Sequence, residues 1–179
     1  GLDLAADLSL VFDHVNLFDE GPTGQEKHRL VKDLEFFNDF SDSEVWEVIN
    51  ASNFLEFDRG DQIISEGDID NSFYVIVRGT VRVIKGDQEL DELHPGDCFG
   101  EMGFIAGKQR TASIFANSNV TVLKVRAALI ERVSLNCQLR FHKVFLNTLV
   151  KRLSMTTTRV SDGSSADTLP ALKAQPTAR

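Results

Sequence analysis

The residues with the clearest chemical potential stand close together in the middle of the chain. Gly100 and Glu101 are followed by Arg110, and a short apolar stretch, residues 102–106, lies between them. A glycine lets the backbone approach a ligand, a carboxylate accepts a hydrogen bond from a sugar hydroxyl, and a guanidinium holds a phosphate through two parallel N–H bonds. The N–H groups of a short helix starting at Glu101 would point at the same anion. The spacing therefore suits a sugar phosphate.

The same residues also have a plainer interpretation. A turn glycine and an incidental surface ion pair between an acid and an arginine are common in proteins. The spacing alone leaves both interpretations open, so the surrounding elements must decide between them.

Composition narrows the class of protein. The chain has 179 residues, 42% of them apolar, which is enough for one globular domain with a full core. No apolar run approaches the ~18–20 residues of a membrane span. The net charge is −8, and residues 1–26 hold six acids and no Lys or Arg. This balance disfavours a nucleic-acid-binding face, but it allows a small anion held by one arginine.

The spacing of the two cysteines and the start of the chain indicate which metal sites and which compartment to expect. Cys98 and Cys137 have no CxxC or Cys/His spacing around them, which disfavours iron–sulfur and zinc sites. We expect both to be plain buried or half-buried residues. No secretory signal pattern is present, so we expect a cytoplasmic protein. The start at Gly1 fits either an excised fragment of a larger protein or a tag remnant, and the sequence leaves both open.

Helical patterns precede the middle of the chain. An apolar stripe predicts a first helix, formed by Leu4, Leu8, Val11, Val15 and Phe18. Residues 21–24 break it, and residues 28–37 predict a second short helix. Ser41 and Glu44 form a capping-box pattern, with Phe40 and Val45 placed as a hydrophobic staple, so a third helix is predicted over residues 42–51.

From residue 53 to residue 125, short β-branched or aromatic runs alternate with glycine-containing turns. The clearest runs are residues 54–57, 62–65, 73–77, 80–84 and 89–93. Such spacing predicts many short antiparallel strands in a sandwich or jelly-roll barrel. Helical periodicity returns with a short helix around residues 129–133 and a longer one over residues 141–155. The fold class is therefore mainly β with flanking α-helices.

Together these stretches resemble the cyclic nucleotide-binding domain family, which includes catabolite activator protein and the protein kinase A regulatory subunits. The resemblance covers residues 36–155 and is strongest over residues 96–102 and 110–112, the family's phosphate-binding cassette. It implies an antiparallel β-roll with N-terminal helices and a long C-terminal lid helix. Gln109, where many members have proline, and Gly103, where many have alanine, are mild departures.

The resemblance also implies roles for individual residues. Glu101 would bind the ribose 2′-hydroxyl and Arg110 the cyclic phosphate, while the purine would lie on strand residues such as Val83 under the C-terminal helix. The residue that caps the base stays open among Arg140, His142 and Asn147. The expected ligand-binding set is Phe99, Gly100, Glu101, Met102, Gly103, Arg110, Thr111, Ala112 and Val83.

The implied function is that of a regulatory module. It would sense cAMP, with cGMP as the alternative ligand, and pass the signal by helix rearrangement to an effector domain or partner outside this segment. The strand at residues 89–93 lacks the arginine often seen in cGMP-selective members, although Thr111 could serve a guanine amino group. We expect an acidic helical segment over residues 1–35, the binding domain over residues 36–160 and a disordered tail or linker over residues 161–179. The C-terminal helix could also form a homodimer seam.

Three rival functions make different demands on the sequence. A metal-dependent enzyme of the cupin type needs a cluster of ligands, and only His94 lies within the predicted roll. A degenerate interaction module would be favoured by loss of Glu101 or Arg110, and both are present. A transcription factor needs a helix-turn-helix after the long helix, where only about twenty residues without that pattern remain. We therefore expect no catalytic residues, no metal and no nucleic-acid or membrane partner.

Overall fold

The computed structural model describes residues 23–107 and 109–163. The helix predicted over residues 4–18 and most of the predicted tail lie outside these ranges. The chain divides into two compact units, one ending at Gln138 and the other beginning at Leu139. The first unit holds every strand of the described chain.

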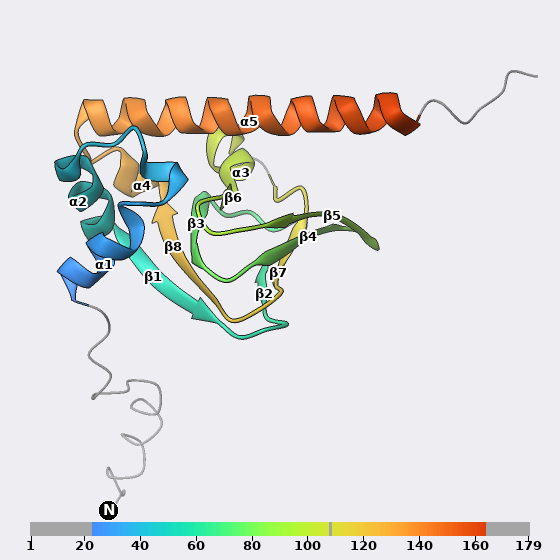
Figure 1. Cartoon of the computed structure of the whole chain (residues 1–179), viewed down its shortest axis with the longest axis horizontal. Helices are drawn as coiled ribbons and strands as arrows, with labels where there is room; N and C mark the ends of the chain where they lie inside the picture. The colour runs from blue at the N-terminus through green and yellow to red at the C-terminus, as the bar shows by residue number, and fades with distance from the viewer. Residues whose placement is uncertain (1–22, 108, 164–179) are drawn as a thin grey trace, which may run out of the picture. The chain divides into compact units, whose positions relative to one another are not determined.

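Two four-stranded antiparallel sheets form the body of the first unit (Figure 1). The strand order of one sheet is β1-β8-β3-β6, with bounds Ser52–Phe57, Val120–Arg126, Ser72–Arg78 and Cys98–Phe99. The order of the other is β2-β7-β4-β5, with bounds Gln62–Ile64, Ser113–Ala116, Val81–Lys85 and Gln88–Leu93. The predicted antiparallel β-roll is thereby confirmed.

The core of the roll is built from apolar residues that both sheets contribute. Strand β3 carries an almost unbroken apolar run, and its residues Ser72–Val77 are all buried. One core cluster comprises Ile64, Tyr74, Ile76, Val81, Leu93, Phe99, Ile114, Ala116, Val120 and Val122. Burial of this β-branched and aromatic surface is the main force holding the sheets together.

Glycines close the turns between strands, as the sequence predicts. Gly79, between β3 and β4, has a left-handed φ of +79°. A Cβ at this position would collide with the backbone oxygen of Asn119, so the turn has no room for a side chain.

The predicted helix over residues 28–37 is wrong in extent. Helix α1 spans Gly24–Val31, and a separate 3-10 turn, η1, spans Glu35–Phe37. The chain turns between them because the adjacent Phe36 and Phe37 are both buried, and Phe36 lies 6.1 Å, ring to ring, from Phe73 of β3. Tertiary packing therefore overrides the local helical pattern.

The remaining helices agree more closely with prediction. Helix α2 spans Asp42–Asn50, and its capping box is present: the Glu44 carboxylate accepts from the Ser41 N–H at 2.7 Å, and the Ser41 hydroxyl accepts from the Glu44 N–H at 3.3 Å. Short helices α3, Glu101–Ala106, and α4, Ala127–Ile130, follow. Helix α5 spans Leu135–Gly163, so it begins before the predicted start at residue 141 and continues past the predicted end at residue 155. In the described ranges, none of these helices combines the length and apolar character required to traverse a membrane.

Candidate functional site

The predicted cassette forms one compact turn between a strand and a helix. Phe99 ends β6, Gly100 adopts a left-handed conformation with φ of +81°, and Glu101 begins α3. Helix α3 packs beside β3 (Figure 1) and ends at Gly107, which is also left-handed. A glycine at each end allows this helix to be only six residues long.

Arg110 is a buried cation, with 4% of its surface exposed. Its Nη1 donates to the Gly100 carbonyl oxygen at 2.7 Å. Its Nη2 donates to the Ser72 carbonyl oxygen at 2.5 Å and to the Asp70 carboxylate at 3.1 Å. The buried Nε has no hydrogen-bond partner among the described residues. The guanidinium is therefore fixed in place through both Nη atoms, while the Nε donor is unused among the described residues.

The glycines of the cassette make room for this guanidinium. A Cβ built on Gly100 would lie 2.7 Å from Arg110 Nη1, and one built on Gly103 would lie 3.0 Å from the same atom. The cassette and Arg110 thus fit each other closely, as expected for a single site.

Two charged residues at this site were missed by the sequence reasoning. Asp70, in the loop before β3, contacts Arg110, and Lys124 of β8 places its Nζ 3.8 Å from the Asp70 carboxylate. Burial raises the pKa of Asp70, but hydrogen bonds from Ser72 and the charges of Lys124 and Arg110 outweigh it, so the pKa lies below its ordinary value. Neither residue lies near the cassette in sequence, so no spacing signal could have found it.

The other predicted residues fall around the same turn. Glu101 is 1% exposed, Gly103 is buried and Met102 is exposed. Thr111 is exposed and Ala112 half-buried, and they lead from Arg110 into β7. The half-buried Val83 of β4 pairs with Ile114 of β7. The structure thus places Gly100 and Gly103 beside Arg110, with Thr111 and Ala112 following Arg110 just before β7 and with Glu101 and Arg110 both buried.

The three residues predicted as candidates for capping the base lie outside the first compact unit. Arg140, His142 and Asn147 all belong to the second unit. Their role therefore stays a prediction.

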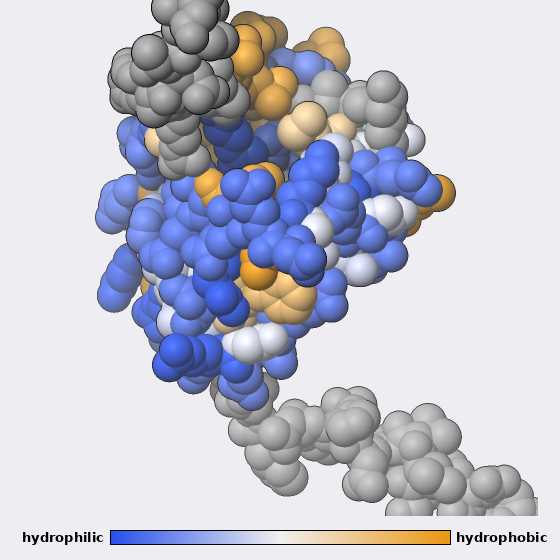
Figure 2. Space-filling view, turned by 90° about the vertical axis from the view of Figure 1, so that its right-hand side faces the viewer, coloured by the Kyte–Doolittle hydropathy of each residue, from blue (hydrophilic) through white to orange (hydrophobic). Residues whose placement is uncertain are grey.

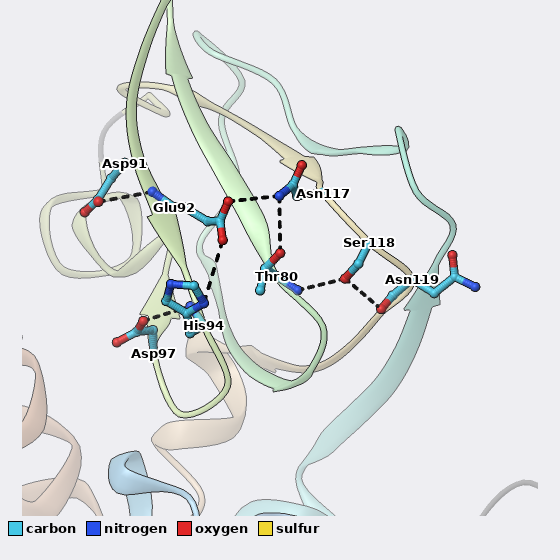
Figure 3. A network of polar contacts seen from close by, with 8 residues as sticks. All are labelled: Thr80, Asp91, Glu92, His94, Asp97, Asn117, Ser118 and Asn119. Atoms are coloured by element: carbon cyan, nitrogen blue, oxygen red, sulfur yellow. Dashed lines mark hydrogen bonds and ion pairs between the residues drawn. The ribbon is translucent and has the colours of Figure 1, made fainter.

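His94 behaves as a turn residue in the structure. Its backbone N–H donates to the Asp97 carboxylate at 2.9 Å, and its ring lies 3.8 Å from the carboxylate of Glu92 (Figure 3). Glu92 also accepts from Asn117 at 2.9 Å, which links β5 to the turn between β7 and β8. Among the described residues, no group of histidines, cysteines and acids could hold a metal ion.

One face of the molecule is mainly hydrophilic. Figure 2 shows polar residues over most of this face, with several separate apolar areas among them.

Comparison with known proteins connects this geometry to a family. Residues 54–136 match the sequence model of the cyclic nucleotide-binding domain. The crystal structure of a cyclic nucleotide-binding domain from Methylobacillus flagellatus superposes with a TM-score of 0.68 and 25% identity, over 83% of this chain and 86% of that one.

Curated relatives include two kinds of kinase component. A cGMP-dependent protein kinase of Toxoplasma gondii is 28% identical over 131 residues, which cover 73% of this chain and 13% of the relative. A cAMP-dependent protein kinase regulatory subunit of Hypocrea atroviridis is 36% identical over 75 residues, 42% of this chain and 16% of the relative. The chain thus corresponds to only a small part of these proteins.

Proposed function

Because residues 54–136 belong to the cyclic nucleotide-binding domain family, we propose that this chain is a sensor that binds cAMP in preference to cGMP and has no catalytic role. The observation that supports this most directly is the buried guanidinium of Arg110, anchored through both Nη atoms with Nε left unpartnered. A cyclic nucleotide carries one negative charge, and burying that charge requires a fixed cation.

Each residue of the proposed site has a specific task. Arg110 neutralises the cyclic phosphate, and Glu101 accepts a hydrogen bond from the ribose 2′-hydroxyl. Gly100, Met102 and Gly103 offer backbone groups to the ribose and phosphate. The remaining contacts come from Phe99, Thr111, Ala112 and, under the base, Val83.

Preference for cAMP is supported by strand β5. Its residues Gln88–Leu93 include no arginine, so this strand has no guanidinium to recognise the guanine edge. Thr111 is the residue that could favour cGMP instead. Competitive titration of one labelled ligand with unlabelled cAMP and cGMP decides between them, and tighter displacement by cGMP contradicts the proposed preference.

Signalling is proposed to run through α5. A ligand shifts a lid between open and closed states only by its different affinity for the two. Hydrogen exchange over residues 139–155, measured with and without saturating cAMP, tests this role, and unchanged protection contradicts it. In this proposal residues 36–160 form the binding domain, the effector lies outside the segment, and a homodimer through α5 is one way to couple them.

Calorimetry with Arg110 variants tests the binding site itself. Truncating a buried charge partner costs ~2–5 kcal/mol, so Arg110→Ala is expected to weaken cAMP binding by more than about tenfold. Arg110→Lys keeps the charge but loses the planar fork, and is expected to recover only part of the affinity. A wild-type chain whose melting temperature is unchanged by cAMP and cGMP would instead indicate a degenerate interaction module.

A further inference from the structure

We infer that Lys124 of β8 belongs to the nucleotide site as a positioning residue that acts through Asp70 on Arg110. This inference rests on the proposed function, because it assigns a role at the same site.

Lys124 lies on the side of β8 that faces the core of the roll. It pairs with Tyr74 of the neighbouring strand β3 in the same sheet, and cross-strand partners lie on the same face of a sheet. Tyr74 is part of the core cluster, so Lys124 lies on the core-facing side of β8 although its side chain remains 24% exposed. A lysine in such a place requires compensation for the water that its ammonium loses.

The aromatic neighbours hold this lysine at the edge of the cassette. Its Nζ lies 5.4 Å from the centroid of the Tyr74 ring, within cation–π distance. Tyr74 stacks on Phe99 with 5.0 Å between ring centroids and 8° between planes. Phe99 directly precedes Gly100. The stacked rings of Tyr74 and Phe99 therefore contact Lys124 through Tyr74 and also support the turn at Gly100 that faces Arg110.

The Asp70 carboxylate connects the two cations. One oxygen accepts from the Ser72 N–H at 3.0 Å, which fixes the carboxylate over its own turn. The other oxygen lies 3.1 Å from Arg110 Nη2 and 3.8 Å from Lys124 Nζ. The carbonyl oxygen of Ser72 also accepts a hydrogen bond from Nη2, so both acceptors for that nitrogen belong to the same turn. The orientation of the turn that holds Asp70 and Ser72 therefore determines the direction of the unpartnered Nε of Arg110.

Charge balance gives Lys124 a second task. Counting formal charges at neutral pH, Arg110 with Asp70 and Glu101 carries one net negative charge, which repels a monoanionic ligand. Lys124 brings the group to neutrality, which removes this repulsion of a monoanionic ligand while Asp70 stays paired with Arg110.

Binding measurements on matched variants test this inference. Lys124→Gln is expected to weaken cyclic nucleotide binding by about threefold to tenfold, while Lys124→Arg restores most of the affinity. Lys32→Gln removes the same charge from an exposed position after α1 and serves as the control. Equal affinities of Lys124→Gln and Lys32→Gln, in a chain whose wild type binds nucleotide, overturn the inference.

A double-mutant cycle tests the route through Asp70. If Lys124 acts through Asp70, Lys124→Gln adds no further loss of affinity to Asp70→Asn, whereas independent roles give additive losses and contradict the proposal. The ratio of affinities for the Rp and Sp phosphorothioate isomers of cAMP reports the orientation of the guanidinium. This ratio is expected to move toward one in both single variants, which a general loss of stability would not cause.

A ligand-free measurement separates this inference from the proposed function. In a carboxyl-carbon NMR titration, Lys124→Gln is expected to raise the pKa of Asp70 and Lys32→Gln to leave it unchanged. A wild type that binds neither cAMP nor cGMP refutes the proposed function while this titration still tests the Lys124–Asp70 pair. An Asp70 pKa that is the same in both variants refutes the pair.

Discussion

The guanidinium of Arg110 donates from Nη1 to the carbonyl oxygen of Gly100, with 2.7 Å between nitrogen and oxygen. Gly100 reaches this position with a left-handed φ of +81°, and a Cβ at Gly100 would come equally close to the same nitrogen. Gly100 therefore provides both the acceptor that anchors the guanidinium and the space that it occupies.

Gly100→Ala is expected to weaken cyclic nucleotide binding strongly, because the new methyl group must push the Arg110 guanidinium aside. Left-handed backbone strain alone costs about 1–2 kcal/mol, so the variant also unfolds more easily. Calorimetry and thermal melting together measure the two effects.

Gly60→Ala is the matched control for this variant. Gly60 has a φ of +98°, and a Cβ there would have no neighbour within 4 Å. It is expected to show the loss of stability without the loss of affinity. Equal affinities for the two variants would mean that the contact between Gly100 and Arg110 does not shape the site.

The buried carboxylate of Glu101 leads to a prediction about the sugar. If Glu101 accepts from the ribose 2′-hydroxyl, 2′-deoxy-cAMP cannot make this charge-assisted hydrogen bond, and its affinity is expected to fall by about tenfold or more. In Glu101→Ala the absolute affinity is lower, but the two ligands differ little. Equal binding of both ligands by the wild type would remove Glu101 from the proposed site.

Much of the roll could be predicted because its determinants are local. The β-branched runs and their turn glycines set the strands of both sheets, and the capping box at Ser41 and Glu44 set the start of α2. The cassette could also be predicted from the sequence, because Gly100, Glu101 and Arg110 lie within one short stretch.

What could not be predicted depends on long-range packing. Asp70 precedes Arg110 by 40 residues, and only the pairing of β3 with β8 brings Lys124 beside it. The break after α1 has a similar origin, because burial of Phe36 against β3 is not encoded by the helical period of residues 28–37. Strand register and aromatic packing decide both features, and neither leaves a pattern in one sequence.

Glu47 of α2 ties that helix to the start of α5. Its carboxylate accepts from the Ser134 backbone N–H at 2.6 Å and from the Ser134 hydroxyl at 2.9 Å. Glu47→Ala removes both bonds and is expected to lower the free energy of unfolding by about 1 kcal/mol, net of solvent compensation. Urea denaturation measures this, with Glu131→Ala, an exposed position at the end of α4, as the control. If both variants lose the same stability, the Glu47–Ser134 contact contributes nothing.

Cys137 predicts how stability changes in alkaline solution. Burial, followed by the charges of Glu47 and Glu44, raises the pKa of its thiol from 9.0 to about 12. The folded state therefore keeps a proton that the unfolded state releases above pH 9, so this contribution to stability is complete below that pH and declines as pH rises toward 12.

Cys137→Ala removes this titration. The variant has a lower baseline stability because it loses buried sulfur, but between about pH 8 and about pH 11 its free energy of unfolding is expected to fall less steeply than that of the wild type. Denaturant midpoints measured across this range provide the comparison. Parallel slopes would show that the folded-state thiol titrates normally, and rapid alkylation of Cys137 in the native protein at neutral pH would lead to the same conclusion.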